Sequence, residues 1–228
     1  MKDSECVQVL DLKRETFIRG YKIPNRISDD LIEWFKSNKD RHSKVNRRAD
    51  ITDKNTTIKK STDISVNPDD LKYEPVFDYV KYLNACIEEY IKCYPSAGAC
   101  EIGLKSSFNI QWYRPKQEGY FARHHERAHN ETACDRVLVF MTYFQDLEDG
   151  GTHFPEQDIK LISRKSTTWI WPADFTHPHY GEVASDDKYI ATGWVEYTGE
   201  LGRKEEYDDQ HVDEENIIEF KETVYEQM

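Results

Sequence analysis

A change in side-chain pattern near residue 104 divides the chain into two parts that should fold differently. Between Pro68 and Tyr94, apolar and aromatic side chains recur every three or four residues, which predicts an amphipathic helix. Beyond residue 104, short segments rich in aromatic and β-branched residues alternate with turn clusters, which predicts short strands. The expected strands are 106–113, 136–144, 158–162, 167–172 and 188–197, and the expected turns are 115–119, 146–151 and 185–187. Helices followed by strands predict a mainly β, α+β fold in which helices brace a β-sandwich or barrel.

The residues before the long helix carry weaker signals. The alternation at residues 7–12 predicts an edge strand, and Ser28 is a candidate N-cap for an amphipathic helix that contains Trp34 and Phe35. Residues 38–60 are polar and basic with almost no large apolar side chains, so we expect a long loop there. That loop is either a flap over a site or a plain surface loop.

Length and charge indicate one domain with an acidic end. The 228 residues are enough for a single domain, which we expect to span residues 1–199. Its helical support is expected at about 28–94 and its β core at about 105–197. Residues 200–228 contain 11 acidic and 3 basic side chains, a net charge of −8. This tail is expected to be a solvated acidic end, with a contact surface for a basic partner as the alternative.

Composition excludes several classes of function. The net charge of −12 lacks the broad basic footprint of a nucleic-acid-binding protein, so no nucleic-acid partner is expected. The five cysteines are an odd number without CxxC spacing, which is neither a zinc-finger pattern nor a disulfide framework. No signal peptide and no apolar run of about 18 residues is present, so we expect no membrane partner and a cytoplasmic location. The pattern does not indicate an oligomeric state.

The residues with the most chemical content lie in the strand-rich half. His124 and Glu126 form a His-x-Glu, and residues two apart in an extended chain face the same way, so both can bind one metal ion. About fifty residues later, His177 and His179 each offer a second imidazole. Two histidines and one carboxylate on one face of an octahedral ion leave three positions open, the arrangement of non-haem iron(II) oxygenases.

Lys188 lies inside an expected strand. If the chain makes a hairpin near residues 185–186, Lys188 pairs with Val183 and shares a sheet face with His179. A lysine that points inward costs roughly several kcal/mol in desolvation free energy unless an anion pairs with it. A dicarboxylate is a natural partner, and a surface lysine beside a turn is the alternative.

Taken in order, these motifs resemble the prolyl-4-hydroxylase-like iron(II)- and 2-oxoglutarate-dependent dioxygenases. The resemblance covers about residues 105–197. The matching pieces are Tyr113–Pro115, Gly119–Phe121 with His124 and Glu126, Arg136–Tyr143, Gly150–Pro155, Trp171–Ala173, the distal histidine and Lys188–Trp194. It implies a double-stranded β-helix, or jelly roll, with the site at one mouth.

The resemblance also implies roles for individual residues. His124 and Glu126 match the first two iron ligands, although most members have Asp where Glu126 stands. The basic residue of the family falls nine or ten positions after the distal ligand, which favours His179 over His177. Lys188 and Tyr143 match residues that bind the distal carboxylate of 2-oxoglutarate, while Tyr113 lines the co-substrate pocket or packs in the core.

The implied reaction uses iron(II), 2-oxoglutarate and dioxygen, with ascorbate as a candidate reductant. It hydroxylates an unactivated carbon and releases succinate and CO₂. The expected substrate is a prolyl residue of a peptide or protein, with a free amino acid or small metabolite as the alternative. A non-catalytic jelly-roll binding module is the competing interpretation from another class.

Overall fold

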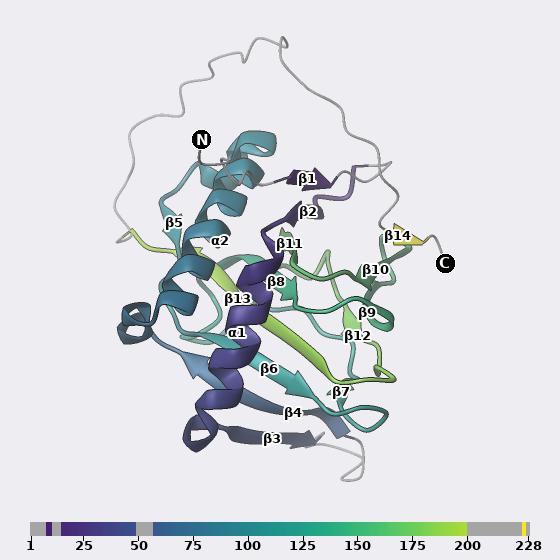
Figure 1. Cartoon of the computed structure of the whole chain (residues 1–228). Coiled ribbons are helices and arrows are strands. Elements are labelled where there is room, and N and C mark those ends of the chain that lie inside the picture. Colours follow the sequence, from purple (N-terminus) through teal and green to yellow (C-terminus); the bar gives the residue numbers. More distant parts are fainter. Residues whose placement is uncertain (1–7, 11–14, 49–56, 200–224, 227–228) are drawn as a thin grey trace.

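The computed structural model describes residues 8–10, 15–48, 57–199 and 225–226. Within them, antiparallel strands form a ten-stranded sheet and a four-stranded sheet, the major and minor sheets (Figure 1). The main path of the major sheet runs β1-β2-β11-β8-β13-β6-β4-β3, with β5 and β7 attached beside it. Its strands are β1 (Gln8–Leu10), β2 (Arg19–Lys22), β3 (Ser43–Arg48), β4 (Thr57–Val66), β5 (Ile102–Gly103), β6 (Phe108–Tyr113), β7 (Gly119–Tyr120), β8 (Arg136–Tyr143), β11 (Thr167–Pro172) and β13 (Lys188–Tyr197).

The minor sheet faces one side of the major sheet, which we call the inward face. Its order is β12-β9-β10-β14, and its strands are β9 (Leu147–Phe154), β10 (Ile159–Ser163), β12 (Tyr180–Gly181) and β14 (Tyr225–Glu226). Apolar side chains fill the space between the sheets, including Met141 of β8, Phe154 of β9 and Trp171 of β11. This arrangement is the expected jelly roll.

Helices cover the opposite, outward face of the major sheet (Figure 1). They are α1 (Asn25–Ser37) and α2 (Glu74–Cys93), and three short 3₁₀ segments accompany them: η1 (Lys39–Arg41), η2 (Pro68–Lys72) and η3 (Pro95–Gly98). The buried stripe of α2 recurs at helical spacing, from Val76 through Leu83 to Tyr90. The hydroxyl of Tyr79 lies 2.9 Å from that of Thr142 on β8, which ties the helix to the sheet.

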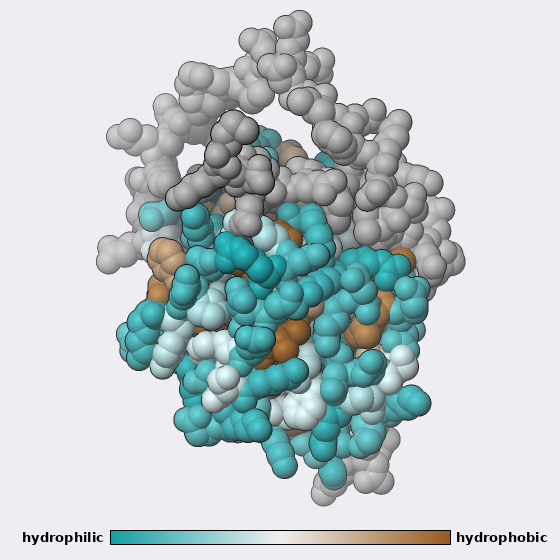
Figure 2. Space-filling model, in the orientation of Figure 1, coloured by the Kyte–Doolittle hydropathy of each residue, from teal (hydrophilic) through white to brown (hydrophobic). Residues whose placement is uncertain are grey.

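Strand alternation divides the interior into two cores. On β8, Leu138 and Phe140 pack with the helices, while Val139 and Met141 pack toward the minor sheet. Each fully buried apolar side chain contributes about 1.5–3 kcal/mol, so a slip of one residue would exchange the two faces at a large cost. The view in Figure 2 is mostly hydrophilic, with apolar side chains in small separate patches. No helix in the described part of the chain is long and apolar enough to cross a membrane.

The expected loop at residues 38–60 is wrong for most of its length. The segment contains η1, the edge strand β3 and the first residues of β4, and β3 pairs with β4 from Ser43 to Arg48. Most side chains of β3 are exposed, so its sequence lacks the apolar alternation that indicates a strand. The strand β3 is defined by its backbone hydrogen bonds to β4, and backbone hydrogen bonds leave no signal in the sequence. Residues 49–56 lie outside the described residues.

Two local expectations also need correction. Ser28 is not an N-cap, because α1 begins at Asn25 and the buried Ser28 hydroxyl lies 2.6 Å from that of Ser166. The expected turn at 146–151 lies largely within β9. Gly150 has a φ of +75° there, a conformation that glycine adopts without strain inside the strand.

The expected hairpin before Lys188 is wrong as well. Residues 180–181 belong to the minor sheet, whereas Lys188 begins β13 of the major sheet and pairs with Tyr113. The chain therefore crosses between sheets instead of folding back on itself. The other predicted strands and the long helix are confirmed with small shifts at their ends, as is the edge strand at residues 8–10. The acidic segment 200–224 lies outside the described residues.

Candidate metal centre

A cavity of about 360 Å³ lies against the inward face of the major sheet. Its walls come mainly from β3, β4, β6 and β13 on one side and from the segments around His124 and His179 on the other. Charged side chains are concentrated in it: Arg47, Lys59, Asp63, Glu126, Arg136 and Lys188. A cavity of this size with converging charged groups can hold a small molecule.

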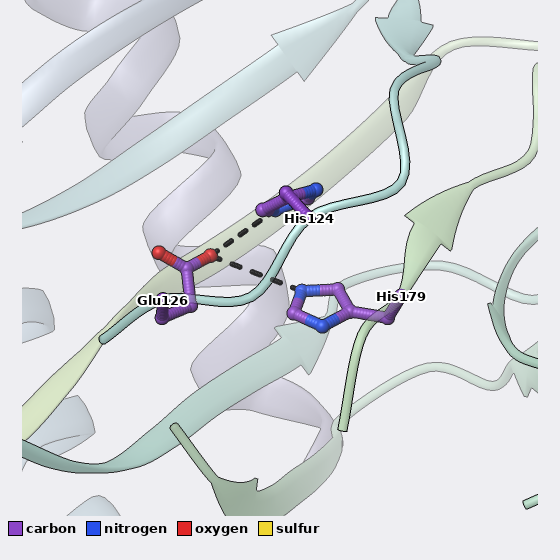
Figure 3. Close-up of side chains that lie close together, drawn as sticks. All are labelled: His124, Glu126 and His179. Carbon is purple, nitrogen blue, oxygen red and sulfur yellow. Dashed lines mark ion pairs between the residues drawn. The ribbon is translucent and has the colours of Figure 1, made fainter. Parts of the chain in front are cut away.

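Backbone hydrogen bonds hold the two distant histidines side by side. The N–H of His124 donates to the carbonyl oxygen of His179 at 3.0 Å, and the N–H of His179 donates back to His124 at 2.8 Å. Their side chains point into the same space, with ring centroids 4.5 Å apart (Figure 3). The pairing brings together two residues that are 55 positions apart.

Both rings are oriented by hydrogen bonds from Nδ1. His124 Nδ1 donates to the carbonyl oxygen of Ala122 at 2.9 Å, and His179 Nδ1 donates to that of His177 at 3.0 Å. A carbonyl can only accept, so each Nδ1 carries the proton and, in the neutral ring, each Nε2 presents its lone pair. Such bonds are how metal-binding histidines are usually oriented.

Glu126 completes the group through Oε1. This oxygen lies 3.2 Å from His124 Nε2 and 3.8 Å from His179 Nε2 (Figure 3). The other oxygen, Oε2, accepts from Trp194 Nε1 at 3.0 Å and lies 3.4 Å from Arg136 Nη1. One carboxylate oxygen is therefore held by the protein while the other faces the imidazoles.

Electrostatics keep Glu126 and His179 in the protonation states that a metal requires. Burial raises the pKa of Glu126, but its neighbours His124, His179 and Arg136 outweigh burial and bring the pKa to about 2. Burial, followed by the charge of His124, lowers the pKa of His179 to about 4. At neutral pH the carboxylate is ionised and the His179 ring is neutral, as metal ligands must be.

The spacing fits one ion. The three ligand atoms all lie within 4.8 Å of one another. Ligand atoms on neighbouring corners of an octahedral ion lie roughly 3 Å apart, at metal–ligand distances of about 2.1 Å. The 3.2 Å contact is close to that value and the 3.8 Å contact is within an ångström of it.

The alternative distal ligand His177 lies outside this group, as do His125 and His153. His177 Nε2 donates to the carbonyl oxygen of Thr16 at 2.8 Å, and its Nδ1 lies 2.8 Å from the Thr176 hydroxyl, so both ring nitrogens are engaged. His125 is exposed. The His153 ring stacks on Tyr180 with centroids 4.8 Å apart.

Lys188 is buried in the same cavity, with 5% of its surface exposed. Its Nζ lies 5.5 Å from the ring centres of both Tyr113 and Tyr143, and no described carboxylate forms an ion pair with it. Burial lowers its pKa to about 8, against the opposing charges of Glu182 and Asp149. The backbone of Gly150 passes close to its stem, since a Cβ there would lie 3.3 Å from Lys188 Cδ.

The two predicted tyrosines flank this lysine, and both are engaged by neighbours. The Tyr143 hydroxyl lies 2.7 Å from that of Thr152, whereas the Tyr113 hydroxyl donates to Gln111 Oε1 at 2.6 Å. The amide nitrogen of Gln111 donates in turn to Asp63 Oδ2 at 3.2 Å.

Several cavity residues were missed from the sequence. Arg136 and Trp194 hold Glu126, and the Arg136 guanidinium lies 3.5 Å from the centre of the Trp194 ring. Asp63 lines the cavity, with Oδ2 2.8 Å from Lys59 Nζ. No spacing signal marks Arg136, which contacts Glu126 and Trp194, or Asp63, which contacts Gln111 on β6 besides Lys59 on its own strand.

Solved structures with this fold include several prolyl hydroxylases. A viral collagen prolyl hydroxylase from Paramecium Bursaria Chlorella virus-1, in complex with 2OG, has a TM-score of 0.56 and 18% identity over 79% of this chain and 96% of that one. A prolyl-4-hydroxylase from Pseudomonas putida has a TM-score of 0.57 and 14% identity over 80% and 94%. A Trichoplax adhaerens prolyl hydroxylase, in complex with a hypoxia inducible factor oxygen degradation domain peptide fragment, has a TM-score of 0.56 and 14% identity over 86% and 85%. No protein-family model and no curated protein matches the chain. At these identities the likeness shows the shared fold.

Proposed function

We propose that this protein is an iron(II)- and 2-oxoglutarate-dependent dioxygenase that hydroxylates an unactivated carbon. One observation carries the proposal. The cavity combines a His-Glu-His group whose ligand atoms lie within 4.8 Å of one another with a buried lysine that no described carboxylate neutralises. The first feature suits a metal ion, and the second suits the remote end of a dicarboxylate.

His124, Glu126 and His179 would hold the iron. Nitrogen and carboxylate donors in this ratio suit iron(II) and leave coordination positions for a co-substrate and dioxygen. When bound, the iron supplies the oxidising power for cleavage of an unactivated C–H bond. Glu126 would bind the iron as a monodentate ligand through Oε1, because Arg136 and Trp194 hold Oε2.

Lys188 would orient 2-oxoglutarate. Its ammonium attracts the carboxylate farthest from the iron, and the rings of Tyr113 and Tyr143 exclude water around that contact. A charged pair formed in such a poorly hydrated place is stronger than one on the surface. Tyr143 can add a hydroxyl contact.

For the substrate, we propose a prolyl residue of a peptide or protein. The shared fold with prolyl hydroxylases, one of them in complex with a peptide fragment, supports this choice. A free amino acid is the alternative. A binding module without catalysis is disfavoured. Such a module would not need the Nδ1 hydrogen bonds that orient His124 and His179, or a buried Lys188 that pairs with no described carboxylate.

The test is succinate formation by the iron-loaded protein with 2-oxoglutarate under air. Wild type should form succinate, and His124→Ala and Lys188→Ala should lose most of it, whereas His177→Ala is the matched control that should keep it. Anaerobic spectra should show the iron–oxoglutarate charge-transfer band. A wild-type protein with neither succinate nor the band would refute the proposal. Peptide libraries then identify the hydroxylated residue.

A further inference from the structure

A second group of charges lines the cavity on the wall formed by β3 and β4. Arg47 and Lys59 stand directly opposite each other in the β3–β4 register, so their side chains share the inward face, and both line the cavity. Like charges directly opposite each other destabilise a strand pair. An anion placed between them would remove that repulsion.

Only part of this charge is neutralised. Lys59 Nζ lies 2.8 Å from Asp63 Oδ2, and this ion pair is almost fully buried. Arg47 contacts the Tyr120 hydroxyl at 3.5 Å and forms no ion pair with any described carboxylate. Among the described residues, the three groups together therefore carry one net positive charge at the cavity.

This charge lies next to the proposed iron ligands. The ring of Tyr120, which Arg47 contacts, stacks on the ring of His124 with centroids 3.7 Å apart. Tyr120 also pairs with Lys59 in the β4–β7 register. A molecule whose reacting carbon approaches the metal group would thus place a neighbouring substituent within reach of Arg47.

The two strands are basic on an otherwise acidic chain. Their described residues contain five cations and one acid, Asp63, whereas the whole chain has a net charge of −12; the cations are Lys44, Arg47, Arg48, Lys59 and Lys60. A local field of this kind concentrates anions at the cavity. Cations on an edge strand also discourage pairing with other chains, but that role does not require any of them to face inward.

We propose that Arg47 and Lys59 form a subsite for a carboxylate of the substrate, so that the protein selects acidic substrates. This inference rests on the proposed function and narrows it. The carboxylate belongs either to a free amino acid or to an acidic residue beside the target residue of a peptide. Lys188, on β13 of the major sheet, remains the partner of 2-oxoglutarate.

The test measures binding without turnover. Wild-type protein loaded with Mn²⁺ and 2-oxoglutarate is titrated without oxygen, by calorimetry, with blocked peptides that have Glu, Ala or Lys on both sides of one proline. L-Proline and L-prolinamide form the second, free-amino-acid arm. The variants are Arg47→Glu and, as the matched control, Lys44→Glu, which makes the same charge change on the same strand but on the opposite face.

In one of the two arms, the probe that carries the carboxylate (the Glu peptide or L-proline) should bind roughly tenfold more tightly than the neutral one (the Ala peptide or L-prolinamide). One good charge pair gives an effect of this size. Arg47→Glu should remove that preference and Lys44→Glu should keep it; the arm that responds identifies the source of the carboxylate. Equal binding of acidic and neutral probes, no binding of any acidic probe, or equal losses in both variants would overturn the subsite. Succinate formation from 2-oxoglutarate is a separate measurement, and its absence would count against the proposed function alone.

Discussion

Replacing Lys188 with methionine tests whether this lysine is buried in the cavity as a cation. Lys188 is 5% exposed, lies between two tyrosine rings and forms no ion pair with a described carboxylate. Methionine has a similar length and no charge, so Lys188→Met removes the buried ammonium without opening a large void. Without 2-oxoglutarate, we expect the variant to be more stable than wild type at neutral pH.

The pKa gives the magnitude and the sign. The fall from 10.5 to about 8 corresponds to about 3.5 kcal/mol, at about 1.4 kcal/mol for each pKa unit. Because the folded protein binds this proton less tightly than the unfolded chain, the full cost is present below pH 8. It disappears as the pH rises toward 10.5. The stability advantage of the variant should therefore shrink over that pH range.

The assay is urea unfolding of the metal-free protein at several pH values between 7 and 10, for wild type and Lys188→Met. Lys44→Met, a change at an exposed position on β3, is the control and should show no such pH-dependent difference. At pH 7, 2-oxoglutarate with Mn²⁺ should stabilise wild type much more than Lys188→Met. A free-energy difference between wild type and Lys188→Met that does not change with pH would refute the reasoning, because the lysine would then not be buried as a cation.

Three further predictions concern the metal group and its surroundings. His179→Ala should abolish high-affinity Mn²⁺ binding in calorimetry, and His177→Ala should leave the affinity within a fewfold of wild type. Trp194→Phe should weaken metal binding by roughly 10- to 100-fold, because Glu126 Oε2 loses its 3.0 Å donor; an unchanged affinity would mean that this contact does not position the ligand. Gly150→Ala should lower the unfolding free energy by about 1–3 kcal/mol, since φ is +75° there and the new methyl group would meet Ala184; urea unfolding measures it.

Local patterns were sufficient for the regular parts of the fold. The helical spacing of α2 reflects burial on one side of a helix, and the continuous apolar run of β8 reflects burial on both faces of a sheet. The edge strand β3 has little buried surface, so its residues are chosen for other reasons and no such pattern is present. The first residues of β9 resemble a turn for another reason, because they contain Asp149 and two glycines, of which Gly150 has a positive φ.

The metal group could be anticipated in part. His124 and Glu126 lie two residues apart in one extended segment, so their common direction follows from strand geometry. The choice between His177 and His179 did not follow from their own spacing, since both share one face of the same segment. Hydrogen bonds decided it: Thr16 and Thr176 occupy the nitrogens of His177, while the bridge to His124 brings His179 inward.

The amino-acid order by itself determined which segments become helix or strand, where the acidic charge accumulates and which residue types could bind a metal. Those properties depend on neighbours along the chain. Only the tertiary structure decided that Lys188 faces the cavity from the major sheet while His179 reaches it from an isolated bridge to His124. It also decided that Arg136 and Trp194 contact Glu126 and that Arg47 lies opposite Lys59. These contacts join residues from different segments of the chain, and the packing of two sheets around one cavity, which no local pattern encodes, brings them together.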